Sequence, residues 1–123
     1  MKNLLKELNL TDKFEFQFRS FELNPSASNE VESKTDERFA NKYHMTIEQA
    51  RKTIENINNL GKNEGIDFKY GSTLYTNTFN AHRLTKYVES KGNIENTEKL
   101  IYLLYDAYFT KNLKLADRDV LNF

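Results

Sequence analysis

The chain has 123 residues, which is enough for one domain with a packed core. It contains no cysteine, so this polypeptide can form no disulfide, thiolate metal site or cysteine nucleophile. Its 18 basic side chains balance 18 acidic ones, which argues against non-specific nucleic-acid binding. No apolar stretch is long enough to span a membrane and no signal-peptide core opens the chain, so we expect a cytoplasmic location.

The first part of the chain predicts a short helix followed by one β-strand. Leu4, Leu5 and Leu8 lie on one side of the helix. From 14 to 21, phenylalanines alternate with polar residues, the period of a strand with one buried face, and a polar loop from Pro25 to Ser33 follows. A lone strand leaves its backbone groups unpaired. We therefore expect it to pair with the same strand of a second copy, forming a homodimer, or to dock on the helices.

Helical patterns dominate the rest of the chain. A short helix around Phe39 ends near His44. The next helix begins at Thr46, whose spacing to Gln49 is that of a capping box, and its apolar stripe runs until Gly61 and Gly65 end the helix. We expect this helix to be amphipathic and packed through that stripe.

Two further helices are predicted before the end of the chain. The first has Asn77 or Thr78 as its N-cap and Gly92 after its last turn, and the second has Asn96 or Thr97 as its N-cap. One face of the first carries Ala81, Leu84 and Val88. The apolar arc of the second is too wide for a surface helix, so we expect it to be the central one.

The last residues predict one more helical turn. Residues 117–123 begin with two aspartates suited to the start of a helix, and Val120, Leu121 and Phe123 are apolar. No polar segment or capping residue follows them, and the predicted strand at 14–21 has no second strand to pair with. On these grounds we expect both ends to be cut from something larger.

The histidines are the first candidates for chemistry. His82 lies on a predicted helix without a visible partner for proton transfer, so a local hydrogen bond is the favoured role. His44 is placed at a helix boundary, and the two histidines have no paired carboxylate at helical spacing. We therefore predict no metal ligand, no cofactor and no catalytic residue.

An aromatic stripe is the second candidate. Tyr102, Tyr105 and Tyr108 recur at a spacing of three, next to Phe109. Such a stripe more often lines a core or a groove than a cofactor site. If part of it is exposed, that part would form an apolar surface to which peptides could bind.

Five short segments stand in a characteristic order in this chain. They are Ser-Phe-Glu-Leu-Asn-Pro at 20–25, Gly-Ile-Asp-Phe at 65–68, Asn-Thr-Phe-Asn-Ala-His-Arg-Leu at 77–84, Leu-Tyr-Asp-Ala-Tyr-Phe at 104–109 and Asp-Arg-Asp-Val-Leu at 117–121. The set resembles the DsbA-like thioredoxin family, in its FrnE-type branch of dithiol-disulfide oxidoreductases. That branch is related to 2-hydroxychromene-2-carboxylate isomerases and to kappa-class glutathione transferases.

The resemblance implies a mainly α chain: the helical insertion domain of a DsbA-like thioredoxin fold, with four to five helices and one N-terminal strand. Residues 1–33 would be a remnant of the thioredoxin-like domain, and 34–123 the inserted helices. In the family a Cys-x-x-Cys begins the first helix, and this chain has none. It also departs from the family at Ser20, where a proline is common, and at Ala116, where a serine usually caps the last helix.

The resemblance also implies where a substrate would bind. In full-length relatives the inserted helices cover the redox site and help to form the groove for a thiol-containing substrate. Carried over to this chain, the groove residues are Asn24, Asn77, His82 and Arg83.

Three functions follow as hypotheses. The first is a truncated or partial FrnE-like thiol-disulfide oxidoreductase, inactive by itself because exchange requires a thiolate. The second is a non-enzymatic helical module that binds a peptide or partner. The third is part of a glutathione-dependent isomerase or transferase of the kappa type. None of the three calls for nucleic acid or a membrane as a partner.

Overall fold

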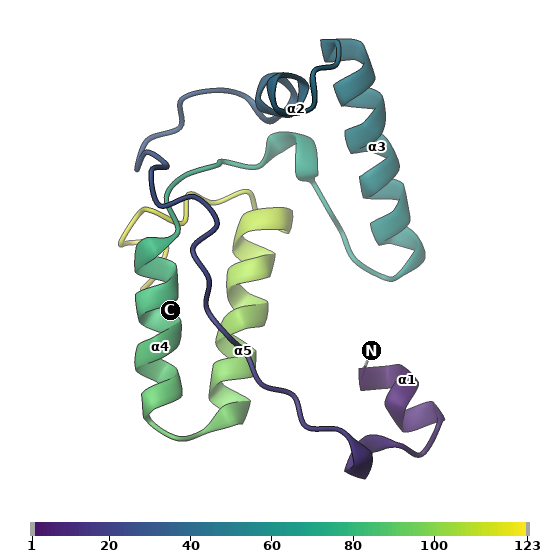
Figure 1. The fold of residues 1–123 in the computed structure, drawn as a ribbon, viewed down its shortest axis with the longest axis vertical. Helices are drawn as coiled ribbons and strands as arrows, with labels where there is room; N and C mark the ends of the chain where they lie inside the picture. Colours follow the sequence, from purple (N-terminus) through teal and green to yellow (C-terminus); the bar gives the residue numbers. More distant parts are fainter. Residues whose placement is uncertain (1, 123) are drawn as a thin grey trace.

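The computed structural model describes residues 2–122, which form five α-helices and no β-strand (Figure 1). The elements in chain order are α1 (Lys2–Glu7), η1 (Thr11–Lys13), α2 (Thr35–Tyr43), α3 (Ile47–Asn63), η2 (Tyr70–Ser72), α4 (Phe79–Ser90), α5 (Ile94–Tyr105) and η3 (Asp106–Thr110). The first two η elements are 3-10 turns, and η3 is a π-helical turn. The expected mainly α fold is confirmed. None of the helices in this range is both long and apolar enough to cross a membrane.

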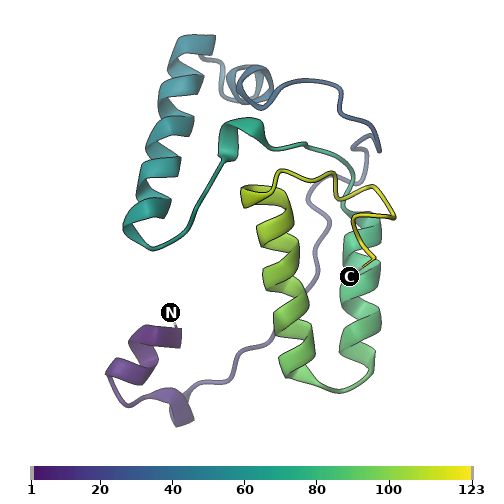
Figure 2. The ribbon, with the colours of Figure 1, turned by 180° about the vertical axis from the view of Figure 1, so that it is seen from behind.

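The helices form two groups with a peripheral helix below them. Figures 1 and 2 show α4 and α5 as an antiparallel hairpin, with α2, α3 and η2 as a second group beside its upper end. The short α1 lies near the opposite end of the molecule, where Lys2 forms an ion pair with Glu98 of α5. Of its leucines only Leu5 is buried, while Leu4 and Leu8 are exposed.

The hairpin contains the main apolar core. Ala81, Leu100 and Leu104 are buried there. Packed around them are Leu84, Val88, Leu115 and Leu121. The predicted face of α4 is thus confirmed. The prediction that α5 is fully central is wrong, because Tyr102 and Tyr105 are each 57% exposed on its other side.

The start of α3 agrees with the sequence. Thr46 Oγ1 accepts from the Gln49 amide at 3.1 Å, and Gln49 Oε1 accepts from the Thr46 amide at 3.0 Å, which completes the capping box. Gly61 does not end the helix but lies inside it, where the Phe68 ring occupies the position a Cβ atom would take. This close approach is the reason that glycine suits position 61.

The start of α5 corrects the predicted cap. Its N-cap is Asn93, in place of Asn96 or Thr97. Asn93 Oδ1 accepts from the Glu95 amide at 3.0 Å and the Asn96 amide at 3.3 Å. Asparagine and threonine are both favoured N-cap residues. Asn93 comes directly after the turn at Gly92, so the helix begins there, before Asn96 and Thr97.

The predicted N-terminal strand at 14–21 is wrong. This segment is extended, but it pairs with no other strand among residues 2–122, and a β-strand requires a partner. It crosses the α4–α5 hairpin instead (Figure 1). Phe18 lines a cavity there together with Ala81 and Leu104. Of the two expected outcomes for a lone strand, this single chain therefore displays docking on the helices.

The C-terminal segment closes on the hairpin in tight turns. The Leu121 amide donates to the Asp117 carbonyl at 3.3 Å, one helical turn away, and Leu121 packs on the core. The predicted apolar residue Phe123 lies outside the described residues.

A buried pair of threonines joins α2 to η2. Thr35 is the largest fully buried side chain, and its Oγ1 donates to the Thr73 carbonyl at 2.9 Å. The two hydroxyl oxygens are 2.8 Å apart, and Thr73 Oγ1 also donates to the Tyr70 carbonyl at 2.8 Å. These bonds satisfy polar groups that water cannot reach.

The first testable prediction concerns Gly61→Ala. Overpacking against Phe68, at roughly 1–3 kcal/mol, opposes the helix-propensity gain of about 1 kcal/mol, so we expect a net loss of up to about 2 kcal/mol in the free energy of unfolding. Urea denaturation followed by circular dichroism measures it. The matched control is Asn59→Ala at an exposed position of α3, which should be neutral or stabilising; equal gains in both variants would contradict the close approach.

The second prediction concerns Thr35→Val. The substitution keeps the shape but leaves the Thr73 carbonyl without its buried donor, so the free energy of unfolding should fall by about 1–3 kcal/mol. Thr53→Val removes an exposed hydrogen bond to the Gln49 carbonyl and should change it by less than about 0.5 kcal/mol. A loss of the same size in both variants, measured by urea denaturation, would count against a special role for the buried pair.

Candidate functional site

Two adjoining cavities form one hollow between the hairpin, the α2 group and the extended segment. Their volumes are about 580 and 340 Å³. We call the combined hollow the aromatic groove. Five of its lining residues border both cavities: Leu23, Thr78, His82, Tyr108 and Phe109. Most of this lining is apolar or aromatic, as in small-molecule and peptide sites.

The π-helical turn η3 positions two aromatic residues that line the groove, Tyr108 and Phe109. Its hydrogen bond runs from the Lys111 amide to the Asp106 carbonyl at 2.9 Å, five residues back. A π-turn has more residues per turn than an α-helix, so it moves Tyr108 off the line that Tyr102 and Tyr105 follow. Tyr108 is therefore half-buried in the groove, whereas the other two tyrosines are exposed.

Neighbouring rings fix the position of Phe109. Its centroid lies 4.8 Å from that of Tyr108 and 5.3 Å from that of Phe68, both edge-on, and 6.2 Å from that of Tyr70 in a stacked geometry. The Phe109 carbonyl accepts from the Lys69 amide at 2.8 Å. Each aromatic contact of this kind adds stabilisation beyond simple burial. The ring of Phe109 is therefore held in place before any ligand binds.

The charged side chains that line the groove are all cationic. Arg38 stacks over the Tyr75 ring, with 4.1 Å between its guanidinium carbon and the ring centroid. Its Nε is buried and has no hydrogen-bond partner among residues 2–122. Lys42 lies beside it and Arg19 lines the smaller cavity, while neither lining includes an aspartate or glutamate of the described chain. The groove therefore favours an anionic group in its occupant.

Tyr108 contributes a neutral hydroxyl. Burial raises the pKa of Tyr108 above its ordinary value of 10.0, opposed by a hydrogen bond with Thr73 and by the positive charge of Arg38. A phenol with a raised pKa keeps its proton at neutral pH. Tyr108 thus serves as a hydrogen-bonding group and not as a base at that pH.

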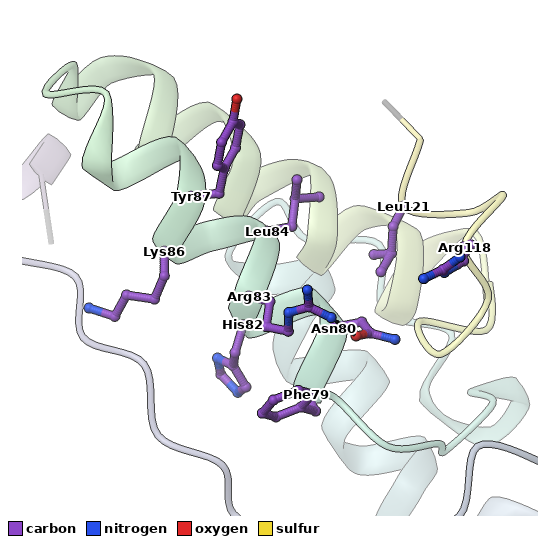
Figure 3. A pocket seen from close by; sticks show the side chains of 9 residues that line it. All are labelled: Phe79, Asn80, His82, Arg83, Leu84, Lys86, Tyr87, Arg118 and Leu121. Atoms are coloured by element: carbon purple, nitrogen blue, oxygen red, sulfur yellow. Dashed lines mark hydrogen bonds between the residues drawn. The ribbon is translucent and has the colours of Figure 1, made fainter.

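Two of the four residues inferred from the family resemblance line the groove. Asn24 lies at its edge, where its Nδ2 donates to the Tyr75 hydroxyl at 3.0 Å, and His82 borders both cavities. Arg83 is on another face of α4: Figure 3 shows its side chain pointing toward Asn80 and away from His82, with 3.2 Å between Nη1 and Asn80 Oδ1. Arg83 therefore lies outside the aromatic groove, although it lines a separate pocket of about 610 Å³ together with His82.

Asn77 has a structural position next to the groove. Its Nδ2 donates to the Ala27 carbonyl at 3.1 Å and the Pro25 carbonyl at 3.3 Å, and its Oδ1 accepts from the Phe79 amide at 2.8 Å. Of the two predicted candidates, Thr78 occupies the N-cap position of α4, but its side chain makes no capping bond. The Asn77 side chain, one residue earlier, satisfies the first amide of the helix and at the same time holds the 25–28 loop against it.

Sequence reasoning missed Arg38 and Tyr75. Acidic and basic residues alternate around Arg38 in the sequence, a pattern typical of a solvated face. No local signal distinguishes it, since its ring partner is 37 residues away in the chain. The aromatic stripe did indicate groove lining, and this is confirmed for Tyr105, Tyr108 and Phe109.

The arrangement suits binding. No three histidine, aspartate or glutamate side chains gather at a metal-binding distance within residues 2–122. Aromatic rings, one cationic edge and neutral hydroxyls provide shape, apolar contact and hydrogen bonds for an occupant.

Comparison with known proteins identifies the family. No curated protein matches the chain. The family model described as DSBA-like thioredoxin domain matches residues 1–122, which is nearly the whole chain. It includes the extended segment, the loop and all of the helices that line the aromatic groove. The chain therefore belongs to the DSBA-like thioredoxin domain family.

Proposed function

We propose that this chain supplies the helical, substrate-binding part of a DsbA-like thiol oxidoreductase and does not itself carry out thiol-disulfide exchange. The proposal rests on one observation above all: a preformed aromatic groove whose charged lining is cationic, in a family member without cysteine. Exchange proceeds through a thiolate attacking a disulfide, so a chain without sulfur nucleophiles can hold a substrate but not react with it.

An extended peptide with apolar and acidic side chains is the occupant that suits the groove. Rings such as Tyr108 and Phe109 offer broad contact to apolar side chains of different shapes. Arg38 and Lys42 at one edge would pair with a carboxylate of the peptide. Contacts of this kind tolerate many sequences, as an enzyme acting on unfolded thiol proteins requires.

Two finer assignments belong to this proposal. The FrnE-type branch is supported by the Asn-Thr-Phe-Asn-Ala-His-Arg-Leu run at 77–84, and a cytoplasmic location is proposed together with that branch. A non-enzymatic peptide-binding module would use the same groove. The kappa-type alternative would place glutathione, a small acidic peptide, at the same cationic edge.

The third prediction is that the purified chain does not reduce insulin. With dithiothreitol as the electron donor, the rate of insulin precipitation should equal that of dithiothreitol alone, because no thiolate is available to form a mixed disulfide. The control is the same chain after heat denaturation, which corrects for effects of protein on the turbidity. Faster precipitation by the folded chain would contradict the proposed lack of exchange.

The fourth prediction concerns peptide affinity. The chain has no tryptophan, so a cysteine-free peptide with one tryptophan, leucines and aspartates can be followed by its own fluorescence without a protein tryptophan signal. We expect saturable binding that Lys42→Glu weakens about fivefold, the effect of roughly 1 kcal/mol at an exposed charge.

The control for that experiment is Lys52→Glu, an identical charge reversal at an exposed position of α3 outside the groove. It should leave the affinity unchanged. Equal weakening in both variants would mean that net charge and not the groove governs binding. Displacement of the peptide by glutathione would favour the kappa-type alternative.

A further inference from the structure

The segment from 14 to 23 is extended but pairs with no other segment among residues 2–122. Within residues 2–122, neither the backbone N–H nor the backbone C=O of any residue in this segment makes a hydrogen bond. Figure 1 shows it running extended across the hairpin. A long row of free backbone donors and acceptors is a template for pairing with another strand.

Side-chain exposure along the segment alternates with a period of two. Glu15, Gln17 and Arg19 are exposed, whereas Phe16 and Phe18 between them are half-buried. Residues with the same parity therefore share a face, as in a β-strand. An added strand must match this alternation, which restricts the possible registers to every second one.

We propose that this segment pairs antiparallel with the same segment of a second copy of the chain, with Gln17 on the two-fold axis. In that register Glu15 lies opposite the partner's Arg19, and Arg19 lies opposite the partner's Glu15. On the other face, Phe16 lies opposite the partner's Phe18. Opposite charges and paired aromatic rings are the cross-strand neighbours that stabilise an antiparallel pair.

The neighbouring permitted registers lack the two pairs between Glu15 and Arg19. A shift by two residues in one direction places Lys13 opposite the partner's Arg19, which brings like charges together. A shift by two in the other direction places Glu15 opposite the partner's Phe21 and leaves the arginines without carboxylates. The sequence of this strand is thus self-complementary in one register, which points to a second copy in preference to an unrelated strand.

Apolar exposure next to the strand supports the same occupant. Phe21 is 75% exposed and Leu23 is 88% exposed, in continuation of the unpaired segment. Antiparallel pairing about Gln17 would satisfy the backbone groups on the facing edge of residues 14–20 and bring the second copy next to Phe21.

A single cysteine tests the position of the axis. Because the chain has no cysteine of its own, Gln17→Cys introduces the sole thiol, and in the dimer the two copies of it would face each other at about 5 Å between Cβ atoms, close enough for a disulfide. Leu23→Cys is the control, since its two copies would lie roughly 40 Å apart along the ribbon.

On mild oxidation, Gln17→Cys should form the disulfide dimer at least about tenfold faster than Leu23→Cys, because pairing raises the local thiol concentration. Non-reducing electrophoresis measures both rates. Equal rates, or a faster rate for the more exposed Leu23→Cys, would overturn the proposed axis.

Charge reversal tests the register. Glu15→Arg alone sets like charges opposite each other at both ends of the pair, and sedimentation equilibrium should show dimerisation weakened by about tenfold or more. Adding Arg19→Glu to it exchanges the two charges and should restore the dimer. Both positions are exposed, so the monomer fold should be unchanged by circular dichroism. A wild type that remains monomeric at its highest soluble concentration, or a double variant no better than the single, would overturn the proposal.

Discussion

Hydrogen bonds between the segment after α3 and the end of α5 hold the two helical groups in one arrangement. The Lys69 amide donates to the Phe109 carbonyl and Thr110 Oγ1 donates to the Asp67 carbonyl, both at 2.8 Å. Asn112, whose φ of 53° ends the helix, donates through Nδ2 to the Lys69 carbonyl at 3.0 Å. The aromatic groove takes lining from both groups, so its shape depends on these bonds.

Under the proposed function, the groove binds a substrate in a chain that cannot carry out the exchange reaction. The groove residues supply aromatic surface, cationic charge and a neutral phenol, which suit a flexible peptide. The sulfur chemistry of a thiol oxidoreductase requires a thiolate that these 123 residues do not contain. In this chain, binding can therefore be measured in the absence of turnover.

The extended segment shows why the alternating pattern misled the prediction of secondary structure. Alternation indicates that one side of an extended chain is covered. Here Phe16 lies under Lys2 of α1 and Phe18 lines a cavity together with residues of α4 and α5, so helices and not a sheet lie against this side. The pattern was correct about conformation and side-chain direction. Strand formation also needs backbone hydrogen bonds from a second segment, and nothing in a local pattern specifies that segment.

Local signals determined the helices and their ends. The capping box at Thr46 and the cap at Asn77 act within a few residues, so spacing alone reveals them. The family was also recognisable from short segments, and the match over 1–122 agrees with it. Asn24 and His82 both line the larger cavity of the groove, whereas Arg83, next to His82 in the chain, does not, because adjacent helical residues point about 100° apart.

Only the tertiary structure decided what the groove is made of. Arg38 and Tyr75 meet across distant parts of the chain, and the π-turn divides an aromatic stripe that looks uniform in the sequence. The sequence pattern predicted Gly61 as a helix stop. The structure shows instead that a residue without a Cβ atom suits this position because the Phe68 ring packs against it. The sequence by itself determined the features governed by neighbours along the backbone; contacts between distant segments depend on how the elements pack, and no short pattern encodes that packing.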